Sequence, residues 1–210
     1  MGEYSGFTLD EYRDALASSD PTPGGGTAAA VALAQGAALA CMVCDLTTGR
    51  DKWQAGWAAA DEVRKIASPL LIRGHELAGE DAAAFDAVMA AFRLPRESEN
   101  EKSLRRTAID VATLGAAEVP LETAIFALNL LKSLPALAKD GNGNAVSDVG
   151  VSALLLSAAC RGALFNVQIN ASSLPDESGK ELMSEVDSLR GKLKTASVLV
   201  MNIVDNRLSQ

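Results

Sequence analysis

Apolar side chains recur three and four residues apart along nearly the whole chain, and most of them are Ala, Leu, Val and Met. This spacing places them on one face of an α-helix, whereas the alternation typical of a half-buried strand is hard to find. The pattern predicts an all-α protein, a bundle of about eight helices packed in two or more layers.

Turn residues divide the helical pattern into eight segments. The expected helices are Thr8–Leu16, Thr27–Leu46, Trp53–Ala78, Asp81–Phe92, Glu97–Ala117, Pro120–Leu137, Ser147–Asn170 and Lys180–Leu208. Because proline lacks the N–H that a helix interior needs, Pro69 is expected to kink or divide the third helix and Pro120 to open the sixth. The pattern contains no internal repeat and no obvious linker, which favours a single domain over 1–210.

The composition indicates what the core is made of. Apolar residues are 48% of the chain and aromatic residues only 4%, so the core is expected to be closely packed Ala, Leu and Val. The run from Thr27 to Cys44 is uncharged and approaches the length of a membrane span. Because Ala barely favours lipid and Gln35 lies mid-run, we expect a buried helix and no membrane partner. The N-terminus, 1–14, carries acids and lacks the apolar core of a signal peptide.

The net charge limits the possible binding partners, and the positions of the cysteines indicate the cellular compartment. The chain carries 27 acidic and 19 basic residues, a net charge of -8, which disfavours a nucleic-acid partner. Cys41, Cys44 and Cys160 lie inside apolar runs, which suits reduced thiols and predicts a cytoplasmic protein. The first two have a CxxC spacing but no second pair and no nearby histidine, so no metal site is expected.

The least ordinary stretch is the turn from Pro21 to Thr27, which reads PTPGGGT. Consecutive glycines at a helix start let a ligand approach the backbone, and the free N–H groups there attract an anion or a carbonyl. A tight turn that packs against a neighbouring helix explains the same residues. Neither a Walker loop nor a Rossmann fingerprint fits, since no Gly-Lys-Ser/Thr follows and no strand precedes.

A second feature is the acidic start of the segment after Gly79. Asp81, Phe85 and Val88 lie near one face of the expected helix. Asp81 has two interpretations, because a carboxylate in the first turn of a helix favours the helix dipole and a carboxylate in a site serves chemistry.

Two Asn-containing segments complete the candidates. The loop 141–144 reads GNGN, and helix capping explains Ser147 and Asp148 after it without any chemistry. Asn166 and Asn170 share one face of an apolar helix, and buried amides there need hydrogen-bond partners. Satisfied core amides are the simpler interpretation of this pair.

Three segments occur in an order that carries a family resemblance. PTPGGGT continues into an Ala-rich run ending in CDLTTGRDKW, EDAAAFDAVMAAFRLP covers 80–95, and GNGNAVSDVGVSALL is followed by NVQIN at 166–170. Together they span most of the chain and resemble the cyclodeaminase/cyclohydrolase family of folate enzymes. That family often has Asn where this chain has Asp45, so the charge either alters ligand contacts or lies exposed.

The resemblance implies an all-helical homodimer that acts on one-carbon tetrahydrofolates. We expect no attached formiminotransferase domain, and the chain is similar to free-standing methenyltetrahydrofolate cyclohydrolases, so the expected reaction is reversible hydrolysis of 5,10-methenyltetrahydrofolate to 10-formyltetrahydrofolate. No metal or redox cofactor is expected. Formiminotetrahydrofolate cyclodeamination, which releases ammonia, and a non-catalytic folate-binding helical dimer are the alternatives.

This substrate assigns roles to the candidate residues. Its methenyl carbon joins two nitrogens in a cationic amidinium, so a carboxylate, Asp81 or Asp148, is expected to hold the cation and to orient or deprotonate the attacking water. Arg50 and Lys52 are expected to meet the anionic tail of the folate. The full set of expected substrate-binding residues is Pro23, Gly24, Gly25, Gly26, Thr27, Arg50, Lys52, Phe85, Asn142, Asn144, Asn166 and Asn170.

Helix geometry constrains how these residues assemble. On one straight helix, Asp148 and Asn166 lie roughly 27 Å apart at 1.5 Å per residue, so both cannot touch one small reacting centre. We therefore expect the site to lie between helices of two subunits, where the glycine turn, the 141–144 loop and the Asp81 end of its helix converge.

Overall fold

The computed structural model describes residues 3–209, which form six α-helices, three short 3₁₀ helices and no strand. The elements are η1 (Glu3–Gly6), α1 (Leu9–Leu16), α2 (Gly25–Thr47), η2 (Asp51–Gly56), α3 (Trp57–Phe92), α4 (Glu99–Asp140), η3 (Gly143–Ala145), α5 (Val146–Ala171) and α6 (Asp176–Leu208). The all-α prediction is confirmed, and so is the short first helix that Thr8 caps. The expected number of about eight helices is wrong.

The count is wrong because two pairs of expected helices are continuous. α3 passes unbroken through Pro69, and α4 passes through Pro120 and Pro135. An interior proline costs a helix about 3 kcal/mol, but the helix segments on both sides pack in the same bundle, and Pro120 is itself buried. Tertiary packing therefore outweighs the local break signal at these positions.

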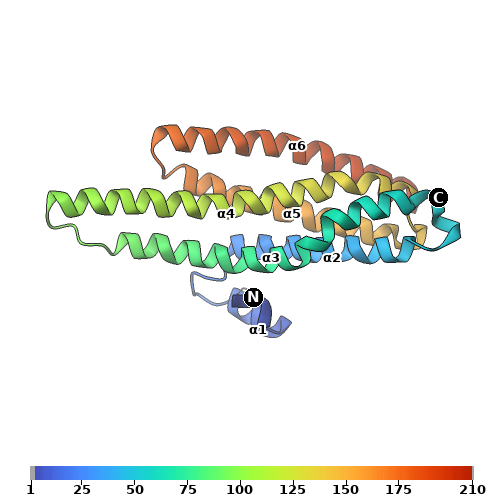
Figure 1. Ribbon diagram of the computed structural model, residues 1–210, viewed down its shortest axis with the longest axis horizontal. Helices are drawn as coiled ribbons and strands as arrows, with labels where there is room; N and C mark the ends of the chain where they lie inside the picture. Colours follow the sequence, from blue (N-terminus) through green and yellow to red (C-terminus); the bar gives the residue numbers. More distant parts are fainter. Residues whose placement is uncertain (1–2, 210) are drawn as a thin grey trace.

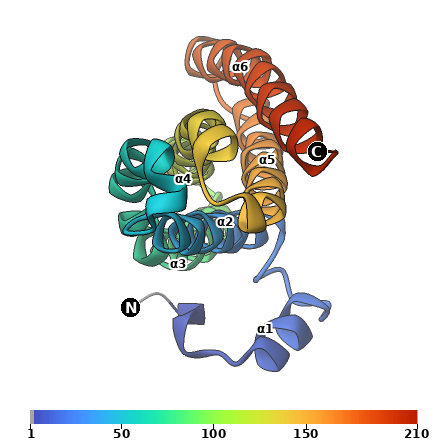
Figure 2. The same ribbon diagram turned by 90° about the vertical axis from the view of Figure 1, so that its right-hand side faces the viewer.

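The long helices run side by side along one axis (Figure 1), and the end-on view separates α6 from the group formed by α2, α3, α4 and α5 (Figure 2). α2 packs against α3 and α5, while α4 contacts α3, α5 and α6. α1 lies outside the bundle (Figure 1, Figure 2), and η1 before it contacts α3. At one end, the hairpin of α3 and α4 extends beyond the other helices (Figure 1).

The core is made of small aliphatic side chains, as the composition predicts. The largest fully buried side chains are all Leu or Val, and Ala fills most remaining positions. The helices approach closely at glycines: a Cβ on Gly36 would lie 2.9 Å from Leu156 Cγ, and one on Gly74 would lie 2.8 Å from Ala34 Cβ. α2 is thus fixed between α3 and α5, and the turn before it is held in place.

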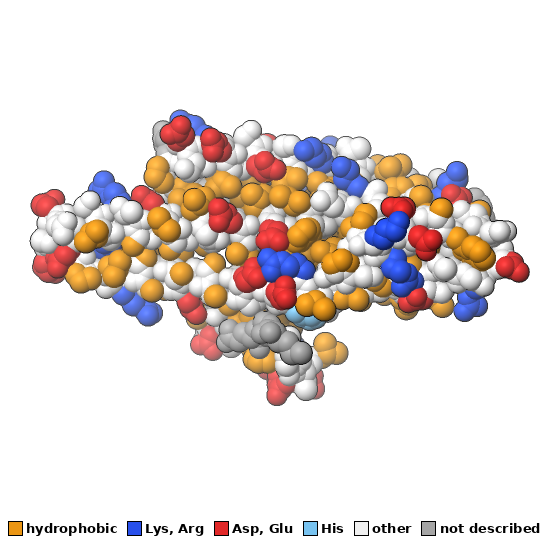
Figure 3. All heavy atoms as spheres, viewed as in Figure 1, with side chains coloured by type: hydrophobic (Ala, Val, Ile, Leu, Met, Phe, Trp, Pro, Cys, Tyr) orange, Lys and Arg blue, Asp and Glu red, His pale blue; other side chains and the backbone are white. Residues whose placement is uncertain are grey.

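Three helical segments are long and apolar enough to cross a membrane by length and composition alone, namely α2, α4 and 143–171. In the structure these segments pack on one another, and 61%, 44% and 50% of their apolar windows is buried. Figure 3 shows charged side chains spread over one face of the molecule, with a band of hydrophobic side chains along the edge where α6 lies beside α4. The expectation that α2 is a buried helix is confirmed, and the absence of a membrane partner stays a prediction.

Candidate functional site

A cavity of about 310 Å³ at the start of α2 gathers seven of the fourteen expected site residues, and we call it the Asp81 pocket. It is lined by the turn before α2, the last third of α3, the middle of α4 and the end of α5. Its lining residues are Pro21, Thr22, Gly24, Gly25, Gly26, Asp81, Phe85, Val88, Ala116, Asn166, Ile169 and Asn170. Segments 145 residues apart in the sequence therefore share one small space, and buried Pro23 and Thr27 flank it.

The glycine turn supplies backbone donors and room for a carboxylate. α2 begins at Gly25, and its first helical hydrogen bond runs from the N–H of Ala28 to the carbonyl of Gly24, 2.9 Å. The N–H groups of Gly25 and Gly26 precede it and have no acceptor within the helix. A Cβ on Gly26 would lie 2.2 Å from Asp81 Oδ1, so only glycine leaves space for this carboxylate.

Asp81 is the one carboxylate in the lining of this pocket. Thr27 donates its hydroxyl to Asp81 Oδ2 at 3.1 Å. Burial raises the pKa of Asp81 above its ordinary value of 3.8, and the hydrogen bonds from the Thr27 side chain and backbone offset only part of this. A carboxylate with a raised pKa accepts a proton more readily, as a general base must.

Asp81 lies well inside α3, which begins at Trp57, and not in the first turn of a separate helix. The helix-dipole interpretation of Asp81 is therefore wrong. The expected convergence on an Asp81 helix end is wrong for the same reason, since α3 continues to Phe92.

Two amides of α5 face the same pocket. Asn166 Nδ2 donates to the carbonyl of Gly162 at 3.1 Å, and Asn170 Nδ2 donates to the carbonyl of Ala116 at 2.7 Å. Both bonds use side-chain N–H groups, so the amide oxygens remain as acceptors. Phe85, 37% exposed, lies one turn after Asp81 and offers a ring for a flat ligand. The pocket thus combines acceptors, one anion, two backbone donors and an aromatic wall.

The other expected residues lie at the opposite end of α2. Asn142 bonds to Thr47, the last residue of α2, and Arg50 and Lys52 follow directly after it. α2 has 23 residues, so about 33 Å separates its ends at 1.5 Å per residue. Within one chain, the 141–144 loop and the Asp81 pocket do not converge.

We call residues 141–144 the Asn142 loop, and its hydrogen bonds hold the loop to α2. The backbone N–H of Asn142 donates to Thr47 Oγ1 at 3.0 Å, and its Nδ2 donates to the carbonyl of Leu46 at 2.8 Å. Its Oδ1 accepts the N–H of Asn144 at 2.9 Å. The polar groups of the Asn142 side chain are therefore used inside the chain, whereas Asn144 is exposed.

The expected capping of α5 by Ser147 and Asp148 is wrong. α5 begins at Val146, and its N-cap residue, Ala145, makes no side-chain capping bond. Asp148 lies in the first helical turn, where its charge favours the helix dipole.

Asp45, where the resembled family often has Asn, lies on the outside of the bundle. Its side chain is 69% exposed and forms an ion pair with Arg64. The charge is therefore solvated and does not enter the Asp81 pocket.

Tyr12 of α1 is a residue whose position the sequence did not indicate. Its hydroxyl is buried, and within residues 3–209 it has no hydrogen-bond partner. Burial raises the pKa of Tyr12 most, followed by the charges of Tyr4 and Asp81. This proximity to Asp81 is not visible in the sequence, because α1 approaches Asp81 only through tertiary packing.

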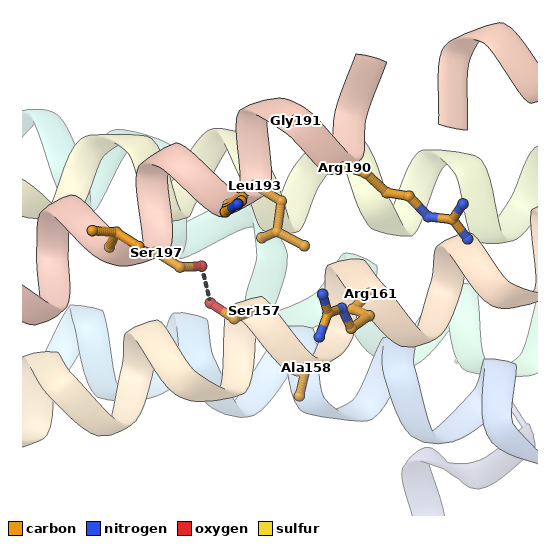
Figure 4. Close-up of a pocket in the computed structure, with 9 residues that line it drawn as sticks. Ser157, Ala158, Arg161, Arg190, Gly191, Leu193 and Ser197 are labelled. Atoms are coloured by element: carbon orange, nitrogen blue, oxygen red, sulfur yellow. Dashed lines mark hydrogen bonds between the residues drawn. The ribbon is translucent and has the colours of Figure 1, made fainter. Parts of the chain in front are cut away.

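A larger cavity, about 630 Å³, lies between α5 and α6 and differs in chemistry (Figure 4). Arg161 projects from α5 and Arg190 from α6, and the hydroxyls of Ser157 and Ser197 lie 2.7 Å apart across it. No carboxylate lines it. A cationic ligand therefore suits the Asp81 pocket better.

The cysteines and possible metal ligands add no second centre in the described part of the chain. Burial raises the pKa of both Cys44 and Cys160 to about 12, so these thiols stay protonated near neutral pH. Among residues 3–209, no group of three His, Cys, Asp or Glu side chains is arranged to hold a metal ion.

Comparisons with known proteins by sequence and by structure agree on one family. Residues 8–188 match the sequence profile described as formiminotransferase-cyclodeaminase. The chain is 35% identical over 203 residues to a methenyltetrahydrofolate cyclohydrolase of Methylorubrum extorquens, covering 96% of this chain and 98% of that protein. It is 35% identical over 204 residues to the formimidoyltransferase-cyclodeaminase of Gallus gallus, covering 95% of this chain but 37% of that protein. A formiminotetrahydrofolate cyclodeaminase from Thermotoga maritima has a similar structure, with a TM-score of 0.85, 27% identity, and 97% and 98% of the two chains covered.

Proposed function

Because the chain belongs to the formiminotransferase-cyclodeaminase family, we propose that it hydrolyses 5,10-methenyltetrahydrofolate to 10-formyltetrahydrofolate, reversibly and in the cytoplasm. The observation that carries this proposal is the partly buried carboxylate of Asp81, with its raised pKa, beside free backbone N–H groups and amide oxygens. The near full-length similarity to a free-standing cyclohydrolase supports hydrolysis as the reaction.

The proposed reaction begins with water. Asp81 takes a proton from the water as its oxygen bonds to the methenyl carbon, which gives a neutral tetrahedral carbinolamine. Asp81 then returns the proton to N5, the bond between the carbon and N5 breaks, and the carbinol hydroxyl loses its proton as the formyl group forms. One proton is released overall. In the ground state the ionised Asp81 also stabilises the cationic substrate.

The remaining walls of the Asp81 pocket hold the ring system. The amide oxygens of Asn166 and Asn170 accept hydrogen bonds from ring N–H groups, and the face of Phe85 packs against the flat pterin. The N–H groups of Gly25 and Gly26 donate to an oxygen of the substrate or intermediate. No step of this scheme requires a metal or a redox cofactor.

We further propose that the protein works as a homodimer joined along α5. One exposed stripe follows the whole helix at steps of three or four residues: Ser147, Val151, Leu154, Ala158, Arg161, Phe165 and Ile169. Such a stripe, mostly apolar, is the pattern with which a helix pairs with another helix. Its midpoint is Ala158, so an antiparallel second copy would place Ala158 against Ala158 and Val151 against Phe165.

This pairing supports a site completed by the second copy. Antiparallel pairing about Ala158 brings the start of α5 in one subunit to the end of α5 in the other. Asn144 of the partner subunit and Asp148 of the partner subunit would then lie near Asn170, and the partner's carboxylate would add to the charge that holds the cation.

The dimer proposal is tested by placing a charge at the midpoint of the stripe. Ala158→Glu puts two carboxylates against each other and should yield monomers in analytical ultracentrifugation, with turnover largely lost and helical content unchanged. Lys65→Glu on α3, whose side chain is 69% exposed, is the surface control and should stay dimeric. A monomeric Ala158→Glu protein with full turnover would overturn the dimer proposal.

Formiminotetrahydrofolate cyclodeamination is a second candidate, because the structural neighbour from Thermotoga maritima is a formiminotetrahydrofolate cyclodeaminase. The same pocket chemistry serves it. N10 attacks the formimino carbon on N5 and ammonia leaves, just as water leaves when the hydrolysis runs in reverse to form the methenyl ring.

The two reactions are separated by following the absorbance of the methenyl form with purified protein. Loss of added methenyltetrahydrofolate supports hydrolysis, whereas formation of the methenyl form and ammonia from the formimino compound supports cyclodeamination. If neither rate exceeds that of buffer while folate still binds, the protein is a folate-binding helical protein and the enzyme proposal fails.

A further inference from the structure

Basic side chains gather at the end of the projecting α3–α4 hairpin. Between residues 93 and 106 the chain has five basic and three acidic residues, although its net charge is -8. The basic residues are Arg93, Arg96, Lys102, Arg105 and Arg106. This end of the hairpin is therefore locally positive on an acidic protein and attracts anions.

Four of these side chains line a cavity of about 380 Å³, which we call the hairpin cavity. Its lining is Arg96, Lys102, Arg105, Arg106 and Ile109, and it contains no carboxylate. Arg105 already has partners within the hairpin. Its guanidinium donates to the carbonyl of Phe92 at 3.0 and 3.2 Å and lies over the Phe92 ring.

Lys102 is also paired, because it forms an ion pair with Glu99 at 2.7 Å. Arg96 and Arg106 differ from their neighbours. Within residues 3–209, neither forms an ion pair or a side-chain hydrogen bond, and both are exposed. Two guanidinium groups are therefore available at this cavity, each able to bind a carboxylate through two parallel hydrogen bonds.

The hairpin cavity is aligned with the Asp81 pocket along one face of α4. Arg105, Ile109, Ala112 and Ala116 follow at steps of four, three and four residues, so they lie on the same helix face. Ile109 lines the hairpin cavity and Ala116 lines the Asp81 pocket. Seven residues separate them, about 10 Å at 1.5 Å per residue. On α3, Val88 at the pocket and Phe92 near the cavity complete an apolar path.

We propose that the hairpin cavity binds the carboxylates of the glutamate tail of a folate whose pterin occupies the Asp81 pocket, an inference that rests on the proposed function. The substrate has its reacting carbon at one end and its anionic glutamate at the other. The p-aminobenzoyl group between them is about 6 Å long, and with the amide that follows it the reacting carbon lies about 10 Å from the first glutamate carboxylate by ordinary bond lengths. The distance along α4 matches this spacer. Arg96 and Arg106 form the carboxylate clamp, and the apolar path packs against the aminobenzoyl ring.

This assignment replaces the expectation that Arg50 and Lys52 meet the tail within one chain. Those two residues follow the far end of α2, while the Asp81 pocket lies at its start. Lys52 also lies over the Trp53 ring, 4.7 Å from its centre. In an antiparallel dimer they would come from the partner, so the experiment must compare the two pairs directly.

The test measures binding by isothermal titration calorimetry with p-aminobenzoyl-triglutamate, a probe that carries the tail but no pterin. Three double variants of the full chain are compared, and each removes two positive charges: Arg96→Ala with Arg106→Ala, Arg50→Ala with Lys52→Ala, and Lys65→Ala with Lys192→Ala as a remote control. Circular dichroism verifies that each variant is folded.

Loss of the two hairpin arginines should raise the Kd of the probe at least about tenfold, while the Lys65 and Lys192 control stays within about twofold of wild type. With triglutamyl methenyltetrahydrofolate, the hairpin variant should raise KM and leave kcat nearly unchanged, because the clamp does not touch the reacting carbon.

Arginine-dependent binding of the probe without any turnover would support the tail site while the hydrolysis proposal fails. The tail site is overturned if wild type does not bind the probe, if the hairpin variant binds it as wild type does, or if only the Arg50 and Lys52 variant loses binding.

Discussion

The two ends of α2 carry similar residues and use them in opposite ways. Both the glycine turn before α2 and the Asn142 loop beyond its end are rich in glycine. The loop contains its own asparagines, and the turn has Asn166 and Asn170 of α5 beside it. In the Asn142 loop the donors and acceptor of Asn142 are taken by Thr47, Leu46 and Asn144. At the glycine turn, backbone N–H groups, two amide oxygens and a carboxylate remain open to a cavity. A polar loop can therefore bind a ligand only where its hydrogen-bonding groups are not already used within the protein.

The largest effect is expected from a substitution that blocks the Asp81 pocket at the start of α2. In Gly26→Ala the new Cβ meets Asp81 Oδ1 at 2.2 Å, so the carboxylate must leave its position and kcat/KM should fall about 100-fold or more. Gly115→Ala is the matched control, because nothing lies within 4 Å of its Cβ and a helix tolerates alanine better than glycine. Steady-state kinetics on both proteins measure the difference, and equal activities would remove Gly26 from the account.

A substitution that breaks a hydrogen bond of the Asn142 loop is expected to lower the stability of the fold. Thr47→Val leaves the buried N–H of Asn142 without an acceptor and should lower the free energy of unfolding by about 1–3 kcal/mol. Thr195→Val is the control, because Thr195 makes only a bond within its own helix. Urea denaturation compares them. A stable Thr47→Val protein that has lost folate binding would show that the loop is a ligand site after all.

A smaller effect is expected for Asp148→Asn. The substitution removes a charge from the first turn of α5 and should cost about 0.3–1 kcal/mol of stability through the helix dipole. If the partner's Asp148 helps to hold the cation, kcat/KM should fall about tenfold, since Asp81 remains the base. A loss as deep as that of Asp81→Asn would make Asp148 the base.

The smallest effect concerns the pH profile. Asp81 must be ionised to take a proton, so activity falls as pH drops through its pKa, which burial holds above 3.8. Thr27→Val removes a hydrogen bond that lowers this pKa, so the acidic limb of kcat/KM should move to higher pH. A limb that stays in place, or moves to lower pH, would show that another group titrates.

Much of the fold could be predicted from the sequence, because helical spacing and caps act locally. The start and end of α2 and of α5 were each expected within two residues of where they lie. Pro69 and Pro120 misled the prediction, since a local break signal does not include the packing that holds α3 and α4 together on both sides of it.

The site was predictable only in part, for the same reason. The glycine turn, Asp81 and the two asparagines of α5 were identified by their residue types, and tertiary packing brings them together. The assignment of Asn142 to the substrate went beyond what its type could show, because hydrogen bonds to residues 95 and 96 positions away are invisible in the sequence. Tyr12 was missed because its neighbours come from distant segments. The hairpin arginines cluster in the sequence at 93–106, but only the fold aligns this cluster with the Asp81 pocket along α4.

The most direct measurement compares wild type with Asp81→Asn in the methenyltetrahydrofolate absorbance assay, with folate binding measured in parallel. Asparagine has the same shape, keeps a hydrogen-bond acceptor toward Thr27 and cannot take a proton from water. We expect wild type to hydrolyse the substrate and Asp81→Asn to bind folate with turnover lower by about 10²–10⁴-fold. Equal turnover in the two proteins would contradict the assignment of Asp81 as the base.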